Sequence, residues 1–166
     1  MNDGLVLYSN AGKTTKTGAE FEFNGKLSDQ LNFEYAASIG NYKFESFKFI
    51  ENDFSNNLMP GIPKSQHNIK IKYKNESNFN LVVGLKRVGK MFADNANKTE
   101  IDGYSSINVK MSKNLNLFET SITPFISIDN LFNKEYFDNI RINAFGSRFY
   151  EPAPGINFIG GLKLNL

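Results

Sequence analysis

Two arginines stand among aromatic residues near the C-terminal end of the chain. Arg141 and Arg148 lie within a segment that also carries aromatic side chains, namely Tyr136, Phe137, Phe145, Phe149 and Tyr150. Guanidinium groups bind carboxylates and phosphates through paired charged hydrogen bonds, and they also lie over aromatic rings. The segment therefore predicts contact with a planar, anionic or catecholate-like ligand through Arg141, Arg148 and Tyr150. The alternative is an aromatic girdle with charges that keep a loop solvated.

Other groups capable of chemistry point to no enzyme. Glu20, Glu22 and Glu34 could form a carboxylate pair for acid–base catalysis, but four lysines at alternating positions suit them better as charge partners: Lys70, Lys72, Lys74 and Lys86. The chain has a single histidine, His67, and no cysteine, so we expect no metal site and no cofactor. The run 94–97 resembles a calcium loop but lacks its spacing and glycine, and is interpreted as a solvated loop. Neither a phosphate-binding loop nor a nucleophile motif occurs, and we predict no enzymatic activity.

The elements that position these groups are predicted to be strands. Apolar and polar residues alternate with a period of two in one segment after another, for example along 31–40, 67–74 and 79–86. No comparable segment carries a helical stripe, and no stretch is long and apolar enough for a transmembrane helix. We therefore expect an all-β chain of about eight strands, counting an incomplete one near 4–10. Pro124 falls within one of these segments, which predicts a sheet edge or a bulge there.

The connections between the predicted strands alternate strictly between short and long. Short polar turns are expected at about 24–29, 75–77 and 113–116. Long connections are expected at about 44–63, 90–102 and 130–155. In an up-and-down meander this order places every short turn at one end of the sheet. Outer-membrane barrels have this arrangement, with short periplasmic turns and longer external loops.

Composition agrees with a barrel wall. The mean hydropathy of −0.38 is that of a soluble protein, but in a barrel the polar half of each strand offsets the half that faces lipid. The chain has 16 Phe and 7 Tyr, which suit strands and membrane-interface girdles. Its net charge of +2 is too small to indicate a nucleic-acid partner. Alternation predicts that one set of residues faces lipid: Phe21, Phe33, Tyr35, Ile71, Tyr73, Leu81, Ile126, Phe158 and Leu162.

Several motifs resemble those of TonB-dependent outer-membrane receptors, the transporters of iron chelates and other scarce nutrients in Gram-negative bacteria. The run 128–136 (IDNLFNKEY) is similar to the family's NLFDKxY signature before the last external loop. The run 149–158 (FYEPAPGINF) is similar to the YxPAPGRxF stretch that opens the final strand, with Ile156 in place of the arginine. Weaker matches lie upstream, in family order: Asn10 with Gly18-Ala19-Glu20, Pro60–Lys64, and Tyr104 after Asp102-Gly103.

The resemblance implies a role and a set of partners. Residues 1–166 would form the C-terminal part of a transmembrane barrel, about eight strands of about twenty-two. Its partners would be outer-membrane lipid, the remainder of the barrel and its plug domain, and an iron chelate or similar small nutrient. We expect TonB to be reached only through an N-terminal part with the plug, which these residues do not include. Residues 1–20 carry no signal-peptide pattern and the last residue, Leu166, is not aromatic, so we expect a fragment that does not transport alone.

Two alternatives remain open from the residues alone. One is a small self-contained barrel of eight strands with a structural role, because eight strands can close around a core of side chains. The other is a soluble ligand carrier of lipocalin type with its apolar residues inside.

Overall fold

The described residues form an all-β chain, as expected. The computed structural model describes residues 12–117, 120–148 and 150–165. The long strands are β1 (Lys13–Lys26), β2 (Leu31–Ser46), β5 (Ser65–Lys74), β6 (Phe79–Val88), β9 (Tyr104–Lys113), β11 (Thr120–Asp129) and β14 (Asn157–Asn165). The short elements are β3 (Lys48–Phe49), β4 (Asn52–Asp53), β7 (Met91–Phe92), β8 (Glu100–Ile101), β10 (Leu115–Leu117), β12 (Phe137–Ile140), the 3₁₀ turn η1 (Phe145–Ser147) and β13 (Tyr150–Pro152).

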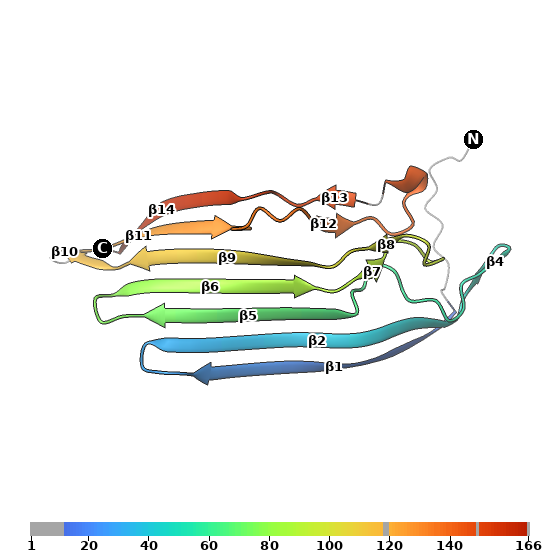
Figure 1. Ribbon diagram of the computed structural model, residues 1–166, viewed down its shortest axis with the longest axis horizontal. Helices are drawn as coiled ribbons and strands as arrows, with labels where there is room; N and C mark the ends of the chain where they lie inside the picture. The colour runs from blue at the N-terminus through green and yellow to red at the C-terminus, as the bar shows by residue number, and fades with distance from the viewer. Residues whose placement is uncertain (1–11, 118–119, 149, 166) are drawn as a thin grey trace.

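The long strands form one antiparallel meander. Each pairs with the next long strand in sequence, in the order β1-β2-β5-β6-β9-β11-β14, and Figure 1 shows them side by side in a single layer. The sheet has eight strands when β10 is counted apart from β9. The expected strand near 4–10 lies outside the described residues. Within the described residues β1 and β14 each pair on one side only, so the sheet is open.

Short and long connections are sorted to opposite ends of the sheet, as the sequence predicts (Figure 1). Residues 27–30 and 75–78 form short connections. β10 and β11 also pair antiparallel, and the two residues between them, 118–119, lie outside the described residues. The long connections are 47–64, 89–103 and 130–156. Three two-stranded sheets stand at this end: β3–β4, β7–β8 and β12–β13.

Two of the expected turns were placed wrongly. Asn24, Gly25 and Lys26 belong to β1, where they pair with β2. Near 113–116 the chain continues from β9 into β10 without reversing, because Ser112 and Leu115 pair with β11 in one common register. The backbone ladder continues wherever a partner strand is present, whatever the polarity of the side chains. Polar residues typical of turns, at the solvent-exposed end of a strand, therefore do not mark the last residue of that strand.

Pro124 lies in a central strand, so the expected sheet edge is wrong. It pairs with Leu162 of β14 on one side. On the other side β11 faces the junction of β9 and β10, and no pair forms opposite Pro124 or Thr123. Because proline has no N–H to donate, this interruption of the ladder is where its ring is accommodated.

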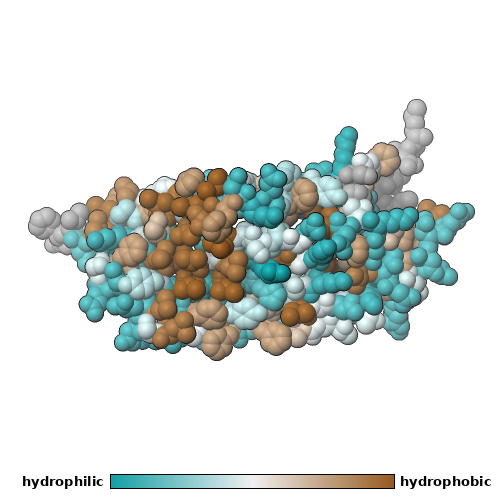
Figure 2. Space-filling model, in the orientation of Figure 1, coloured by the Kyte–Doolittle hydropathy of each residue, from teal (hydrophilic) through white to brown (hydrophobic). Residues whose placement is uncertain are grey.

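The cross-strand register places the nine residues predicted to face lipid on one face of the sheet. Directly paired residues of antiparallel strands point to the same side, and the pairs Phe33↔Ile71, Tyr73↔Leu81 and Pro124↔Leu162 join these residues from strand to strand. Phe21, Phe158 and Leu162 on this face are 55%, 65% and 69% exposed. Figure 2 shows apolar side chains gathered in a band across the strands. That this face contacts lipid remains a prediction.

The opposite face is polar and carries paired charges. Glu34 of β2 forms ion pairs with Lys70, at 3.4 Å, and with Lys72 of β5. Of the three glutamates expected to be charge partners of the lysines, Glu34 has this role in the structure. The small buried core lies instead at the long-loop end, where Phe47 packs between Phe44 and Phe54 with ring centroids 4.8 and 5.5 Å away.

Candidate functional site at the long-loop end

A cleft of about 800 Å³ opens between the connections 89–103 and 130–156. It is lined by Glu100, Ile101, Asp102, Gly103, Tyr104, Asn133, Lys134, Glu135, Tyr136, Phe137, Tyr150, Pro152, Ala153 and Gly155. Tyr104 begins β9 opposite Val88, on the polar face of the sheet. The cleft therefore adjoins the face that would line the interior of a closed barrel. Its volume is within the range of small-molecule sites, about 300–1,000 Å³.

Two stacked aromatic pairs form the apolar part of this cleft. The rings of Tyr104 and Tyr136 lie 3.9 Å apart at 16°, and those of Phe137 and Tyr150 lie 4.4 Å apart at 25°. Burial, together with the nearby Tyr104 and Asp138, raises the pKa of the Tyr136 hydroxyl. The phenol consequently stays protonated above its ordinary range and remains a hydrogen-bond donor beside a planar surface.

The three predicted ligand residues are not brought together. Tyr150 lines the cleft, whereas neither Arg141 nor Arg148 is among the lining residues. The Nε atom of Arg141 donates to Oε1 of Glu151 at 2.6 Å, and its guanidinium forms an ion pair with the same carboxylate. Hydrogen bonds from Asn139 and Arg141 lower the pKa of Glu151. Arg148 is exposed and forms no ion pair or hydrogen bond within the part of the chain that the structure describes. Phe149 lies outside that part.

The cleft is held at its base by two asparagines from the NLFNK run. Asn130 is 4% exposed, and its Nδ2 donates to the carbonyls of Lys134 at 2.9 Å and Pro154 at 3.2 Å. Its Oδ1 accepts from the amide of Lys134 at 2.8 Å. Asn133 accepts from the amide of Ile156 through Oδ1 at 2.9 Å. In the sequence this run is notable only for its similarity to the family signature. Its asparagines also have a physical role, since they join the two ends of the last long connection.

Side-chain amides also tie the three long connections to one another. Asn57 donates through Nδ2 to the carbonyl of Asn95 at 2.8 Å. Asn97 accepts from the amide of Leu58 at 2.7 Å and donates back to its carbonyl at 2.8 Å. The amide of Asn95 donates to Oδ1 of Asn143 at 2.9 Å. The connections thus form one continuous surface above the sheet.

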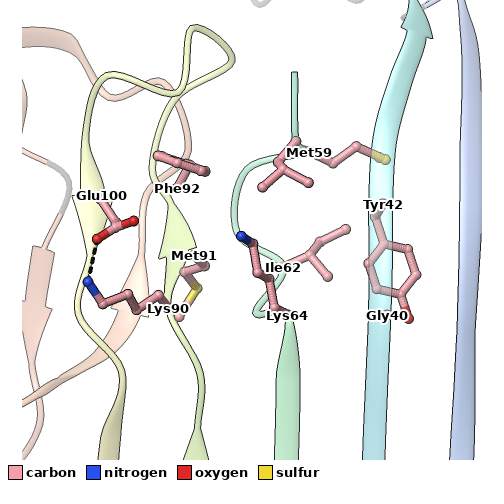
Figure 3. A pocket seen from close by; sticks show the side chains of 10 residues that line it. Gly40, Tyr42, Met59, Ile62, Lys64, Lys90, Met91, Phe92 and Glu100 are labelled. Carbon is pink, nitrogen blue, oxygen red and sulfur yellow. Dashed lines mark hydrogen bonds and ion pairs between the residues drawn. The ribbon is translucent and has the colours of Figure 1, made fainter. Parts of the chain in front are cut away.

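A second, much smaller crevice lies between β2 and β7 (Figure 3). It has a volume of about 10 Å³ and lies among Tyr42, Met59, Ile62 and Met91. Lys90 lies at its edge and pairs with Glu100 at 2.7 Å and with Asp102 at 3.5 Å. The crevice has room for about one water molecule. It represents packing between two connections and leaves the larger cleft as the candidate site.

The described residues contain no group of three or more His, Cys, Asp or Glu side chains placed to hold a metal ion. Among the same residues no helix is long and apolar enough to cross a membrane.

The meander, its apolar and polar faces and its sorted connections define a segment of a transmembrane β-barrel wall with an external cleft. A family model described as "TonB dependent receptor-like, beta-barrel" matches residues 1–131. The chain belongs to this family, whose members are outer-membrane proteins of Gram-negative bacteria.

Individual relatives agree with this assignment. The ferrioxamine receptor of Yersinia enterocolitica is 24% identical over an alignment of 138 residues, and the match covers 79% of this chain and 18% of the receptor. Among solved structures, the siderophore receptor PiuA from Acinetobacter baumannii superposes with a TM-score of 0.76 at 20% identity, over 93% of this chain and 22% of that one. The ferric yersiniabactin uptake receptor FyuA from Yersinia pestis gives 0.71 at 15% identity, over 93% and 24%. The chain thus spans about a fifth of these relatives.

Proposed function

We propose that this chain forms part of the wall and external vestibule of an outer-membrane receptor for an iron chelate or similar scarce nutrient. The observation that carries the proposal is the cleft with two stacked aromatic pairs, which adjoins the polar face of a barrel wall. Stacked rings offer a flat apolar surface to a planar ligand, and Tyr136 adds a hydroxyl donor. The relatives' names, a ferrioxamine receptor and a siderophore receptor, support this ligand class.

The partners in this proposal are outer-membrane lipid, the rest of a receptor barrel, a plug domain and TonB. We do not expect the 166 residues to transport by themselves, because the described strands form an open sheet that encloses no pore. Neither the self-contained small barrel nor the soluble carrier is favoured, since the family match and the open sheet both support a segment of a larger wall. We propose no catalytic role.

Within the site we assign the contacts with the ligand to Tyr136 and Tyr150, with Arg148 as a cation at the rim. For Arg141 we propose a positioning role in place of ligand contact, because its guanidinium is held by Glu151. It would stabilise the β12–β13 hairpin and so position Tyr150, which neighbours Glu151 in β13. An anionic ligand would then meet Arg148 before Arg141.

Tyrosine fluorescence can test this site, because the chain has no tryptophan and 7 tyrosines. The folded chain in uncharged detergent would be titrated with a ferric tris-catecholate and with a neutral ferric trihydroxamate. We expect saturable quenching, and Tyr136→Leu should weaken binding by about tenfold, or about 1.4 kcal/mol. Arg148→Gln should lower the affinity for the anionic tris-catecholate and leave the affinity for the neutral trihydroxamate unchanged.

The matched control is Tyr73→Leu, which removes a tyrosine from the opposite face of the sheet. Its affinity for both probes should equal that of the parent. If Tyr136→Leu and Tyr73→Leu bind alike, the aromatic cleft is not the site. If Arg141→Gln lowers the affinity and Arg148→Gln does not, Arg141 is the arginine that contacts the ligand.

A further inference from the structure

A groove of about 510 Å³ lies on the apolar face of the sheet, which is the face opposite the candidate site. Three neighbouring strands, β2, β5 and β6, contribute its lining residues: Phe33, Tyr35, His67, Ile69, Leu85 and Arg87. Most of these side chains are apolar or aromatic, but two can donate hydrogen bonds to an anion. The groove therefore combines a hydrocarbon surface with a polar end.

The polar end of the groove lies where the apolar face becomes polar over β5, β6 and β9. The register aligns Phe21, Ala37, His67, Arg87 and Ser105 in one row across five strands, apolar on β1 and β2 and polar on the other three. The next outward-facing row toward the short turns contains Ile69, Leu85 and Ile107. Lipid headgroups meet a barrel at such a boundary between apolar and polar side chains. Arg87 and His67 thus stand at headgroup depth on the long-loop side.

Among the described residues Arg87 has no charge partner at this boundary. It is exposed, and within the described ranges of the chain no ion pair or hydrogen bond involves its guanidinium. The adjacent Lys86 points to the other face, where its Nζ lies 5.8 Å from the centre of the Tyr104 ring. A cation on a lipid-contacting face is costly unless it meets water or an anion. A guanidinium forms paired hydrogen bonds with a phosphate, for which its planar fork is well suited.

His67 is positioned to add a second contact. The hydroxyl of Tyr35 lies 3.0 Å from Nδ1 of His67, and the two rings stack with centroids 6.2 Å apart at 16°. When the tyrosine hydroxyl donates to Nδ1, the imidazole carries its hydrogen on Nε2 and can offer it to an oxygen acceptor. Arg87 is the cross-strand partner of His67, so the two side chains stand next to each other at this end of the groove.

We propose that this groove binds an anionic membrane lipid from the leaflet on the long-loop side. The phosphate of the lipid accepts hydrogen bonds from Arg87 and His67, and an acyl chain lies along Phe33, Ile69 and Leu85. The site is separate from the candidate ligand cleft, because it uses the opposite face of the sheet.

The single histidine of the chain gives a direct measurement, because its ring signals in an NMR spectrum arise from the site. The chain would be folded in dodecyl maltoside micelles and titrated with dihexanoyl phosphatidylglycerol. Parallel titrations would use dihexanoyl phosphatidylcholine, which has the same acyl chains but no net charge, and glycerol phosphate, which has no acyl chain. Native mass spectrometry of the same samples would count retained lipid. Heat-modifiable gel mobility would establish that each variant is folded.

We expect saturable shifts of the His67 ring signals with phosphatidylglycerol, weaker binding of phosphatidylcholine, and none of glycerol phosphate. Arg87→Gln should weaken phosphatidylglycerol binding by about tenfold or more, and Arg87→Lys by less, because the ammonium keeps the charge but not the fork. Lys86→Gln removes a charge from the next residue on the other face and should stay within about twofold. Equal affinities in Arg87→Gln and Lys86→Gln would overturn the proposal. Binding of glycerol phosphate as tight as that of the lipid would also overturn it, since the site would then take free phosphate.

Discussion

The buried amide of Asn130 offers the sharpest test of how the last long connection is held. Asn130 is 4% exposed and has a φ of 51°, in the left-handed region. Its side chain makes three hydrogen bonds, two to the carbonyls of Lys134 and Pro154 and one from the amide of Lys134. We expect Asn130→Ala to open the base of this connection while the strands remain paired.

The size of the effect follows from the hydrogen bonds that the substitution removes. Three hydrogen bonds at about 1 kcal/mol each give about 3 kcal/mol. Alanine in the left-handed region costs about 1 kcal/mol more than asparagine, whose short polar side chain makes this conformation more accessible. The expected loss is therefore about 4 kcal/mol for the closed connection relative to the open one, which is about a thousandfold in the equilibrium between them.

Hydrogen exchange at the amide of Ala153 measures this opening. That amide donates to the carbonyl of Tyr136 at 2.9 Å, a bond that Asn130 does not share. Its exchange should be about a thousand times faster in Asn130→Ala, provided that the global stability of the chain does not limit the rate.

Two variants separate the loss of the hydrogen bonds from the cost of the left-handed backbone. Asn130→Gly removes the side chain but tolerates the left-handed backbone, so its effect should be smaller by about 1 kcal/mol. Asn139→Ala removes an exposed amide with one bond to Glu151, at 2.9 Å, and should change exchange by less than about tenfold. If Ala153 exchanges in Asn130→Ala at the parent's rate, the three hydrogen bonds do not hold the connection closed.

Two further predictions concern the wall and the middle loop. Phe33→Lys should cost roughly 2–4 kcal/mol of folding stability in lipid. Ala36→Lys, on the polar face opposite Glu22, should cost far less. Folding would be scored by heat-modifiable gel mobility at increasing denaturant, and equal losses in the two variants would mean that the faces are assigned wrongly. Burial raises the pKa of Asp94, but hydrogen bonds from Lys98 and Thr99 outweigh it and hold the pKa below the ordinary 3.8. Because the folded-state pKa is depressed, Asp94 stabilises its loop above this value and the benefit is lost as pH falls below it. Exchange at the Thr99 amide, corrected for its intrinsic pH dependence, should therefore rise between about pH 5 and about pH 3. The rise in exchange should be absent in Asp94→Asn. If the rise persists in that variant, another titrating group causes it.

Alternation alone was sufficient to predict the strands and their faces. In a strand every second side chain points to the same side of the sheet, so the alternation of apolar and polar residues shows directly which residues share a face. A shift of one residue in the pairing of two strands would put apolar and polar residues on the same face. The ends of the strands could not be predicted in the same way. Asn24, Gly25 and Lys26 have turn chemistry, yet their backbone groups find partners in β2 and the ladder continues. At the watery ends of a barrel both faces are polar, so hydropathy no longer distinguishes strand from turn.

The candidate site was less predictable because its contacts are not local. Glu151 reaches Arg141 only through the β12–β13 hairpin, whose register shifts between Phe137 and Asn139. Tyr104 begins β9 and Tyr136 follows β11, so these rings stack although 31 residues of chain lie between them. The sequence showed arginines among aromatics but held no sign of which cation a carboxylate would neutralise. Of the three predicted residues Tyr150 lies at the cleft and the two arginines do not line it, and their contact with a ligand stays a prediction.

The hydrogen bonds between connections restrict how a ligand could change this site. Asn57 and Leu58 of the first connection bond to the second, and Asn95 of the second bonds to Asn143 of the third. The amide of Asn143 in turn donates to the carbonyl of Ala93 at 2.9 Å. If one connection moved over a bound ligand by itself, it would break these bonds, each worth about 1 kcal/mol. Movement of the three connections together would preserve them. Closure over the cleft should therefore be collective, and a substitution in the first connection should alter binding at a cleft that it does not line.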